Sequence, residues 1–170
     1  LHICDISKQA LADCATAHPD WGITDCDVSQ EAQVAQLFEE VSRQMGGLDV
    51  LINNAGIAGQ TGGIEELSSD KWRQTIDINL NGQFYCARLA VPMLKQSDNA
   101  SIICLSSVAG RLGYAYRTPY AVTKWAIIGL IKSLAIELGP QGIRVNALLP
   151  GIVEGPRIEQ VISARAKTVG

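Results

Sequence analysis

Residues Ser106–Leu134 read SSVAGRLGYAYRTPYAVTKWAIIGLIKSL: a strand end, a loop rich in Gly and Tyr, and a helix. Tyr120 and Lys124 are four residues apart, so on a helix their side chains lie on one face. A phenol has a reference pKa of about 10, and a nearby ammonium group lowers that pKa by favouring the phenolate. Ser107, at the preceding strand end, can offer a second hydrogen bond to the same substrate oxygen. The stretch predicts a proton-transfer site for a carbonyl/alcohol pair.

The Tyr-x-x-x-Lys spacing is a weak signal by itself. An exposed helical Lys next to a partly buried Tyr produces the same pattern without any chemistry. The interpretation of Tyr120 and Lys124 therefore depends on the rest of the chain.

Composition and charge exclude several classes of function. The 170 residues suffice for one domain with a substantial core, and we treat residues 1–170 as a single domain. Hydrophobic residues make up 47% and charged residues 18%, which is typical of a folded protein. The net charge is −3 without a basic cluster, so the sequence does not predict nucleic-acid binding. No apolar run reaches membrane-spanning length and the start lacks a signal-peptide layout, so no membrane association is predicted.

The cysteines and histidines do not suggest a metal site. The five cysteines are scattered without a Cys-x-x-Cys pair: Cys4, Cys14, Cys26, Cys86 and Cys104. An odd, unclustered set fits reduced thiols in a cytoplasmic protein. The only histidines, His2 and His18, lie near the N-terminus. We therefore expect neither a metal ion nor a Cys–His nucleophile.

Short apolar strands alternate with helices along the chain. The predicted strands are Leu1–Cys4, Trp21–Cys26, Leu48–Ile52, Ala100–Leu105 and Ile143–Leu149. The predicted helices are Ser7–Ala17, a helix from Ser29 to the Gly46 stop, Ser69–Lys95 with a break near Asn81, Thr118–Leu138 and Ile158–Thr168. This alternation predicts an α/β fold with a doubly wound, Rossmann-like parallel sheet in a three-layer α/β/α arrangement.

Ligands of open parallel sheets bind beyond the carboxyl ends of the strands. The predicted strands end at Asp5, Asp27, Asn53 to Gly56, Ser106-Ser107 and Pro150-Gly151. The Asp5 carboxylate can accept hydrogen bonds from both hydroxyls of an adenosine ribose and repels a 2′-phosphate, so it favours NAD(H) over NADP(H). Alternatively, Asp5 and Asp27 are acidic groups at helix N-termini, and Asn53 to Gly56 is an ordinary strand-to-helix turn.

The order and spacing of these groups resemble the short-chain dehydrogenase/reductase family, in its short single-domain branch. The residues that carry the resemblance are Asp27-Val28, Asn53-Asn54-Ala55-Gly56, Asn79 within DINLNGQF, Ser107, Tyr120 with Lys124, and Pro150-Gly151. The chain is similar to 3-oxoacyl-ACP-reductase-like proteins and related NAD-dependent alcohol dehydrogenases.

The resemblance implies an oxidoreductase that transfers a hydride between NAD(H) and a secondary alcohol or ketone. It implies that Tyr120 is the general acid/base and that Lys124 holds the nicotinamide ribose and lowers the Tyr120 pKa. Ser107 would orient the substrate oxygen, and Asn79 would complete a proton relay through water. The implied cofactor contacts, besides Tyr120 and Lys124, are Asp5, Asp27, Val28, Asn53, Asn54, Ala55, Gly56, Pro150, Gly151, Ile152 and Val153.

The chain departs from the family pattern at both ends. The Gly-rich phosphate turn, which the family carries upstream of Asp5, is absent, and the glycines from Gly56 to Gly63 follow a different strand. In the strand order 3-2-1-4-5-6 the first predicted strand matches strand 2, so the central strand 1 is missing. We expect the strands to separate into groups of two and three. We also expect a partial chain that lacks the first strand–turn–helix unit and the C-terminal end. In addition, Gly155 stands at the position where the family often has a cofactor-binding Thr.

The substrate and the assembly are less closely defined. Tyr114, Tyr116 and Arg117 can line a pocket for a small alcohol or carbonyl compound, and Arg117 or Arg157 either binds a carboxylate or is simply solvated. The alternative to an enzyme is a non-catalytic dinucleotide-binding or subunit-interaction protein, or a fragment too incomplete to bind cofactor. The surplus apolar surface of Thr118–Leu138 suggests a homo-tetramer or homo-dimer, and family members commonly pair through this helix and the Ser69–Lys95 region.

Overall fold

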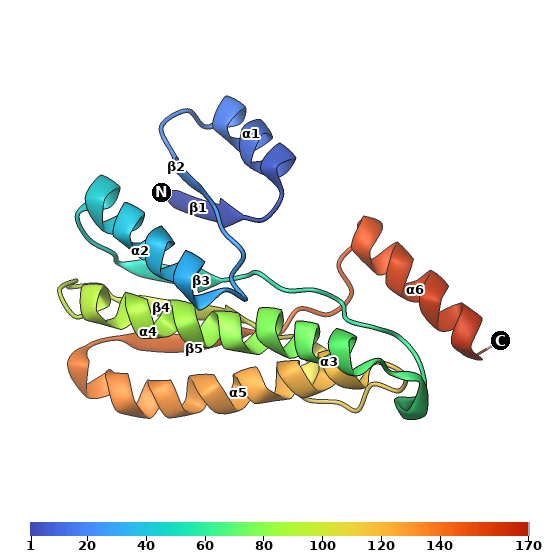
Figure 1. The fold of residues 1–170 in the computed structure, drawn as a ribbon. Helices are drawn as coiled ribbons and strands as arrows, with labels where there is room; N and C mark the ends of the chain where they lie inside the picture. The colour runs from blue at the N-terminus through green and yellow to red at the C-terminus, as the bar shows by residue number, and fades with distance from the viewer. Residues whose placement is uncertain (170) are drawn as a thin grey trace.

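The computed structural model describes residues 1–169, except for the side chains of Arg157 and Val169. Its strands are β1 (His2–Asp5), β2 (Gly22–Asp25), β3 (Val50–Asn53), β4 (Ser101–Leu105) and β5 (Arg144–Leu148) (Figure 1). Its α-helices are α1 (Lys8–Ala17), α2 (Glu31–Met45), α3 (Ser69–Ile76), α4 (Gly82–Leu94), α5 (Thr118–Leu138) and α6 (Pro156–Val169). A π-helical segment η2 (Asp77–Asn81) joins α3 to α4, and 3₁₀ turns η1 (Ile64–Glu66), η3 (Val108–Gly110) and η4 (Gly139–Gln141) complete the set.

The strands form two parallel sheets. One holds β1 and β2, and the other holds β3, β4 and β5 in that order. Leu51 of β3 lies opposite Ile102 of β4, which lies opposite Val145 of β5. Within residues 1–169, no strand pairing joins β1 to β3. The predicted parallel α/β fold is confirmed, and so is the expected separation into two and three strands.

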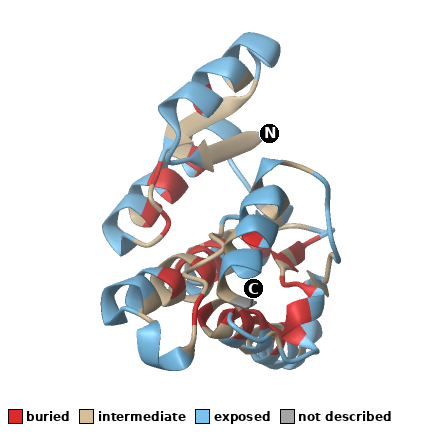
Figure 2. Ribbon diagram, turned by 90° about the vertical axis from the view of Figure 1, so that its right-hand side faces the viewer, coloured by how far each residue is buried: buried red, intermediate tan, exposed pale blue. Residues whose placement is uncertain are grey.

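The core lies where α2, α4 and α5 pack on one face of the strands. It contains Val34, Leu37 and Phe38 of α2, Ala90 and Leu94 of α4, Ile127 of α5, and Ile102, Cys104 and Val145 of the sheet. Figure 2 shows the buried residues concentrated around the three-stranded sheet and its helices, whereas the unit of β1, β2 and α1 is mostly exposed or half-buried. On the opposite face of the larger sheet, Val50, Ile52 and Leu148 are exposed.

Several helix boundaries follow from local chemistry. The Ser7 side chain accepts a hydrogen bond from the backbone N–H of Ala10, so Ser7 is the N-cap of α1. Helix α2 ends at Gly46, whose φ of 71° is left-handed and suits glycine. Helix α5 covers Thr118–Leu138 as predicted.

Several predicted boundaries were wrong, and β3 begins at Val50 rather than at the predicted Leu48. Helix α2 begins after Gln30 rather than at Ser29, because the Ser29 N–H bonds to Asp27 Oδ1 in a local turn. The stretch Ser69–Lys95 is not broken at Asn81, because the π segment η2 carries the helical path into α4. Helix α6 begins at Pro156, two residues before the predicted start, since Pro suits a first helical position.

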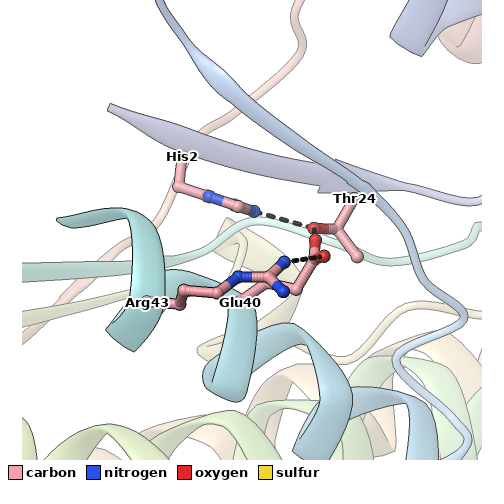
Figure 3. A network of polar contacts seen from close by, with 4 residues as sticks. All are labelled: His2, Thr24, Glu40 and Arg43. Atoms are coloured by element: carbon pink, nitrogen blue, oxygen red, sulfur yellow. Dashed lines mark hydrogen bonds and ion pairs between the residues drawn. The ribbon is translucent and has the colours of Figure 1, made fainter. Parts of the chain in front are cut away.

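A polar network joins both strands of the smaller sheet to α2 (Figure 3). Thr24 Oγ1 donates its hydroxyl proton to Glu40 Oε2 at 2.8 Å. His2 Nε2 lies 2.8 Å from Thr24 Oγ1, and because that hydroxyl proton is already used, His2 is the donor to Thr24. Arg43 Nη2 donates to Glu40 Oε1 at 2.7 Å. Burial lowers the pKa of His2, and the negative charge of Glu40 opposes this effect only in part.

This network makes the stability pH-dependent. The unfolded chain binds a proton at His2 with a pKa near 6.5, and the folded chain binds it only at lower pH. Protonation of His2 therefore costs more in the folded chain than in the unfolded chain. The unfolding free energy is independent of His2 above about pH 6.5 and decreases as the pH falls from there through the lower folded-state pKa. We expect His2→Gln to reduce the loss of unfolding free energy between pH 7.5 and 5.5, measured by urea denaturation. His18→Gln is the control, and equal losses in wild type and His2→Gln would contradict the assignment.

Candidate active site

The carboxyl end of β4 places two serines next to α5. The Ser106 N–H bonds to the Leu148 carbonyl at 2.9 Å, and Ser106 Oγ donates to the backbone carbonyl of Lys124 at 2.8 Å. Ser107 is buried, and its Oγ accepts the N–H of Ala109 at 3.2 Å, which caps the turn η3. The hydroxyl proton of Ser107 can therefore be donated to another group.

Close packing at Gly110 sets the distance between η3 and α5. A Cβ atom built on Gly110 would lie 2.6 Å from the Lys124 carbonyl oxygen and 2.6 Å from Ser106 Oγ. Because a real Cβ does not approach backbone atoms so closely, only glycine allows this contact. Ser107 and Lys124 thus lie on two elements in direct contact.

Tyr120 and Lys124 lie together on the first turns of α5. The Lys124 side chain is buried, and its Nζ donates to the Leu105 carbonyl at 2.7 Å. The same Nζ lies 5.4 Å from the centroid of the half-buried Tyr120 ring. Thr123, which the sequence reading missed, donates its hydroxyl to the Tyr120 carbonyl at 2.8 Å. The arrangement keeps a cation beside the phenol ring.

Asn79 connects this part of α5 to the loop that follows β3. Its side chain is fully buried, its Oδ1 accepts the N–H of Ile57 at 2.7 Å, and its Nδ2 donates to the Ile57 carbonyl at 3.0 Å. A further contact joins Nδ2 to Thr123 Oγ1 at 3.2 Å. A Cβ on Gly56 would lie 3.1 Å from Asn79 Oδ1 and 3.9 Å from Lys124 Nζ. The structure therefore brings Asn79, Gly56 and Lys124 together.

The residues of the predicted turn after β3 divide into two groups. Asn53 is buried and its Nδ2 donates to the Gln83 carbonyl at 3.3 Å, so it packs β3 against α4. Asn54 and Ala55 are exposed, and Gly56 is half-buried. The exposed part of the turn is the part that a ligand can reach.

Three predicted cofactor contacts, Asp5, Asp27 and Val28, lie at or just after the ends of β1 and β2. Asp5 is exposed and its Oδ1 accepts the N–H of Ser7 at 2.7 Å. Asp27 is half-buried and its Oδ1 accepts the N–H of Ser29 at 2.9 Å. Val28 is buried against Gly82, and a Cβ atom built on Gly82 would lie 3.0 Å from the Val28 carbonyl oxygen. Each carboxylate thus supports its local turn with one oxygen.

The residues after β5 lie beside the end of β4. The Pro150 carbonyl accepts the N–H of Val108 at 3.1 Å. Gly151, Ile152 and Val153 are exposed, with Ile152 at 83%. They are brought to the same sheet edge as Ser107.

Arg117 is the residue whose surroundings differ most from expectation. It is 2% exposed, so the alternative of a solvated Arg was wrong, because the side chain packs under the loop after β3. Its Nη2 donates to the Ala58 carbonyl at 2.8 Å. The only sequence signal is its position at the start of α5, three residues before Tyr120. The side chain of Arg157 lies outside the described residues.

Other chemistry is limited in residues 1–169. In this range no group of three or more His, Cys, Asp or Glu side chains is placed to hold a metal ion. No helix of the described chain has both the length and the apolar character needed to cross a bilayer. All five cysteines are free thiols, and burial raises the pKa of Cys86 to about 12.

Comparisons with known proteins identify the family. A family model of the short-chain dehydrogenase/reductase type, described as enoyl-(acyl carrier protein) reductase, matches residues 1–168. The chain belongs to the short-chain dehydrogenase/reductase family. This short-chain dehydrogenase/reductase is 42% identical over 143 residues to a 3β-hydroxysteroid dehydrogenase of Mediterraneibacter gnavus. The match covers 84% of this chain and 51% of that protein, so the chain spans about half the length of this curated relative.

Solved structures support the same assignment. The chain superposes on NAD⁺-bound xylitol dehydrogenase with a TM-score of 0.94 and 28% identity, covering 99% of this chain and 67% of that one. It superposes on ElxO with NADP bound with a TM-score of 0.86 and 28% identity, covering 97% of this chain and 68% of the other. The first of these structures holds NAD⁺ and the second holds NADP.

Proposed function

We propose that this short-chain dehydrogenase/reductase transfers a hydride between NAD(H) and a secondary alcohol or ketone. The observation that carries the proposal is the pairing on α5 of Tyr120 with the buried Lys124, whose Nζ lies 5.4 Å from the phenol ring. Ser107 at the adjoining end of β4 supplies a hydroxyl for the same substrate oxygen. The names of the relatives, several of which are dehydrogenases, support the reaction class.

The proposed proton transfer uses Tyr120 as acid and base. In oxidation the Tyr120 phenolate takes the hydroxyl proton of the alcohol, and in reduction the phenol returns it to the carbonyl oxygen. Ser107 Oγ, which already accepts the Ala109 N–H, donates a hydrogen bond to the substrate oxygen. This hydrogen bond holds the substrate oxygen in place. The Lys124 ammonium, bonded to the Leu105 carbonyl, keeps a positive charge beside the phenolate.

We propose that Asn79 mainly holds the loop after β3 in position. Both polar atoms of its side chain bond to the Ile57 backbone, with a further contact to Thr123. The predicted relay through water stays a prediction. The direct consequence of these bonds is that the loop after β3 is fixed against α5.

The residues fit a nicotinamide dinucleotide in part. Asp5 is proposed to hold the adenosine ribose, the exposed turn Asn54 to Gly56 to lie along the cofactor, and Lys124 to hold the nicotinamide ribose. The remaining proposed contacts are Asp27, Val28 and Asn53, together with Pro150, Gly151, Ile152 and Val153. When bound, the nicotinamide accepts or supplies the hydride, while the protein orients the substrate. The connection from β1 to α1 contains no Gly, so the phosphate-binding turn is not found there.

A cofactor screen tests the proposal and the role of Asp5. With small ketones, we expect the full-length protein to prefer NADH over NADPH by at least about tenfold in kcat/KM, because the carboxylate repels a 2′-phosphate. Asp5→Asn keeps the oxygen that accepts the Ser7 N–H and should reduce this ratio. Asp13→Asn, an exposed acid on α1, is the matched control. A preference for NADPH would contradict the role of Asp5.

We also infer a small-molecule substrate and a homo-dimer or homo-tetramer. Phe84 of α4 and Val122 and Trp125 of α5 are 40–49% exposed, which leaves apolar area on the helices proposed to pair. The five free thiols support a cytoplasmic location. Sedimentation of the full-length protein measures the assembly, and a monomer at micromolar concentration would contradict it.

A further inference from the structure

Arg117 is a buried cation at the start of α5. With 2% of its surface exposed, it is among the largest fully buried side chains in the described residues. Its backbone is also held, because its N–H bonds to the Tyr114 carbonyl at 3.1 Å and its carbonyl accepts the Ala121 N–H at 2.9 Å. Removing a charged group from water is costly, so its local contacts must offset that cost.

The guanidinium group of Arg117 contacts two aromatic rings. Its Cζ lies 5.1 Å from the centroid of the Tyr120 ring and 5.4 Å from that of Tyr114. Lys124 Nζ lies 5.4 Å from the same Tyr120 ring. Arg117 is the N-cap residue of α5, three residues before Tyr120, and Lys124 lies four residues after Tyr120. The ring is therefore contacted by one cation from each side along the chain.

The same guanidinium group reaches the loop that follows β3. Arg117 Nη2 donates to the Ala58 carbonyl at 2.8 Å, directly after the residue whose backbone Asn79 holds. One residue before Arg117, the Tyr116 carbonyl accepts the N–H of Gly62 at 3.0 Å. The loop and the start of α5 are therefore joined at two points, Ala58 with Arg117 and Gly62 with Tyr116.

We propose that Arg117 is a positioning residue of the proton-transfer site, which sets the Tyr120 ring relative to the loop of Gly56 to Ala58. The proposal rests on the proposed function, in which Tyr120 carries the proton. It follows from the contacts of one planar group with both the ring and the loop. A substrate-binding role fits less well, because the guanidinium is buried, donates to Ala58 and contacts the Tyr114 and Tyr120 rings.

The test replaces Arg117 in the full-length protein and separates kcat from KM. Arg117→Met keeps the length of the side chain but removes its charge and its donors. We expect kcat to fall about 10- to 100-fold, with KM for the alcohol changed less than about threefold, because a misplaced acid/base group weakens the transition state. Arg117→Lys keeps the charge without the planar fork and should recover part of the loss. Arg111→Met is the control, because Arg111 is an exposed Arg in the connection from β4 to α5, and this variant should behave as wild type.

A kinetic isotope effect gives a readout that loss of folded protein does not change. With an alcohol deuterated at the reacting carbon, we expect a larger isotope effect on kcat in Arg117→Met, because the chemical step becomes more rate-limiting. Thermal melts followed by circular dichroism report the folded fraction. If Arg117→Met does not fold, the same measurements on Arg117→Lys decide the outcome.

The outcomes separate this proposal from the proposed function. An unchanged kcat per folded protein in Arg117→Met, with or without a lower Tm, overturns the positioning role. A rise in KM confined to carboxylate substrates also overturns it and assigns Arg117 to substrate binding. Turnover that survives in Tyr120→Phe contradicts the proposed function itself. If Tyr120→Phe is inactive while Arg117→Met is normal, only the role of Arg117 fails.

Discussion

Replacing Tyr120 by Phe is expected to lower kcat of the full-length protein by about 10²- to 10⁴-fold. The substitution removes the hydroxyl that carries the proton, whereas the ring and its contacts with Arg117 and Lys124 remain. Because the ring is retained, the unfolding free energy should change little. The loss should therefore appear in kcat and kcat/KM, and only weakly in KM for the cofactor.

The measurement is NADH-linked turnover with each accepted ketone, together with NADH binding followed by fluorescence. Tyr85→Phe on α4 is a matched control, because it also removes one phenol hydroxyl and this residue has no proposed role in the site. Full turnover in Tyr120→Phe would disprove the acid/base assignment. Binding of NADH without turnover in the wild type would instead support the non-catalytic dinucleotide-binding alternative.

Replacing Gly110 by Ala is expected to lower the free energy of unfolding by about 1–3 kcal/mol. The new Cβ would lie 2.6 Å from the backbone oxygen of Lys124, and a backbone atom of a helix cannot move aside as the end of a side chain can. The turn η3 must then shift away from α5 and carry Ser107 with it. We therefore expect kcat to fall together with the stability.

Gly113→Ala is the control for this substitution. A Cβ on Gly113 meets no atom within 4 Å, so the change should be neutral or slightly stabilising through the unfolded chain. Urea denaturation at fixed pH measures both variants. Equal transition midpoints for Gly110→Ala and Gly113→Ala would show that η3 and α5 are not in the close contact described.

Much of the fold and part of the site could be predicted because their signals are local. The bounds of α5 follow from Pro119 near its start and from Gly139-Pro140 at its end. The four-residue spacing of Tyr120 and Lys124 similarly places both on one side of α5, as the 5.4 Å contact reflects. The alternation of strands and helices likewise indicated parallel sheets, and the absent partner between β1 and β3 followed from the strand order.

The errors arose where packing overrides local preference. The sequence around Asn81 suggested a helix break, because Asn followed by Gly commonly ends helices. Instead, the chain continues through a π segment in which the buried Asn79 satisfies the backbone of Ile57, 22 residues away. A solvated Arg117 was one predicted alternative, because a single Arg in a polar loop is usually exposed, and its burial rules that alternative out.

By itself, the sequence determined the α/β class, the parallel strands and the pairing of Tyr120 with Lys124, because periods of two and of three to four residues are properties of short segments. The tertiary structure alone decided that Gly110 touches the backbone of Lys124, that Asn79 holds Ile57, and that Arg117 reaches Ala58 from 59 residues away. The partner of a buried polar group is whichever backbone the packed loops bring to it, and no local spacing encodes that choice.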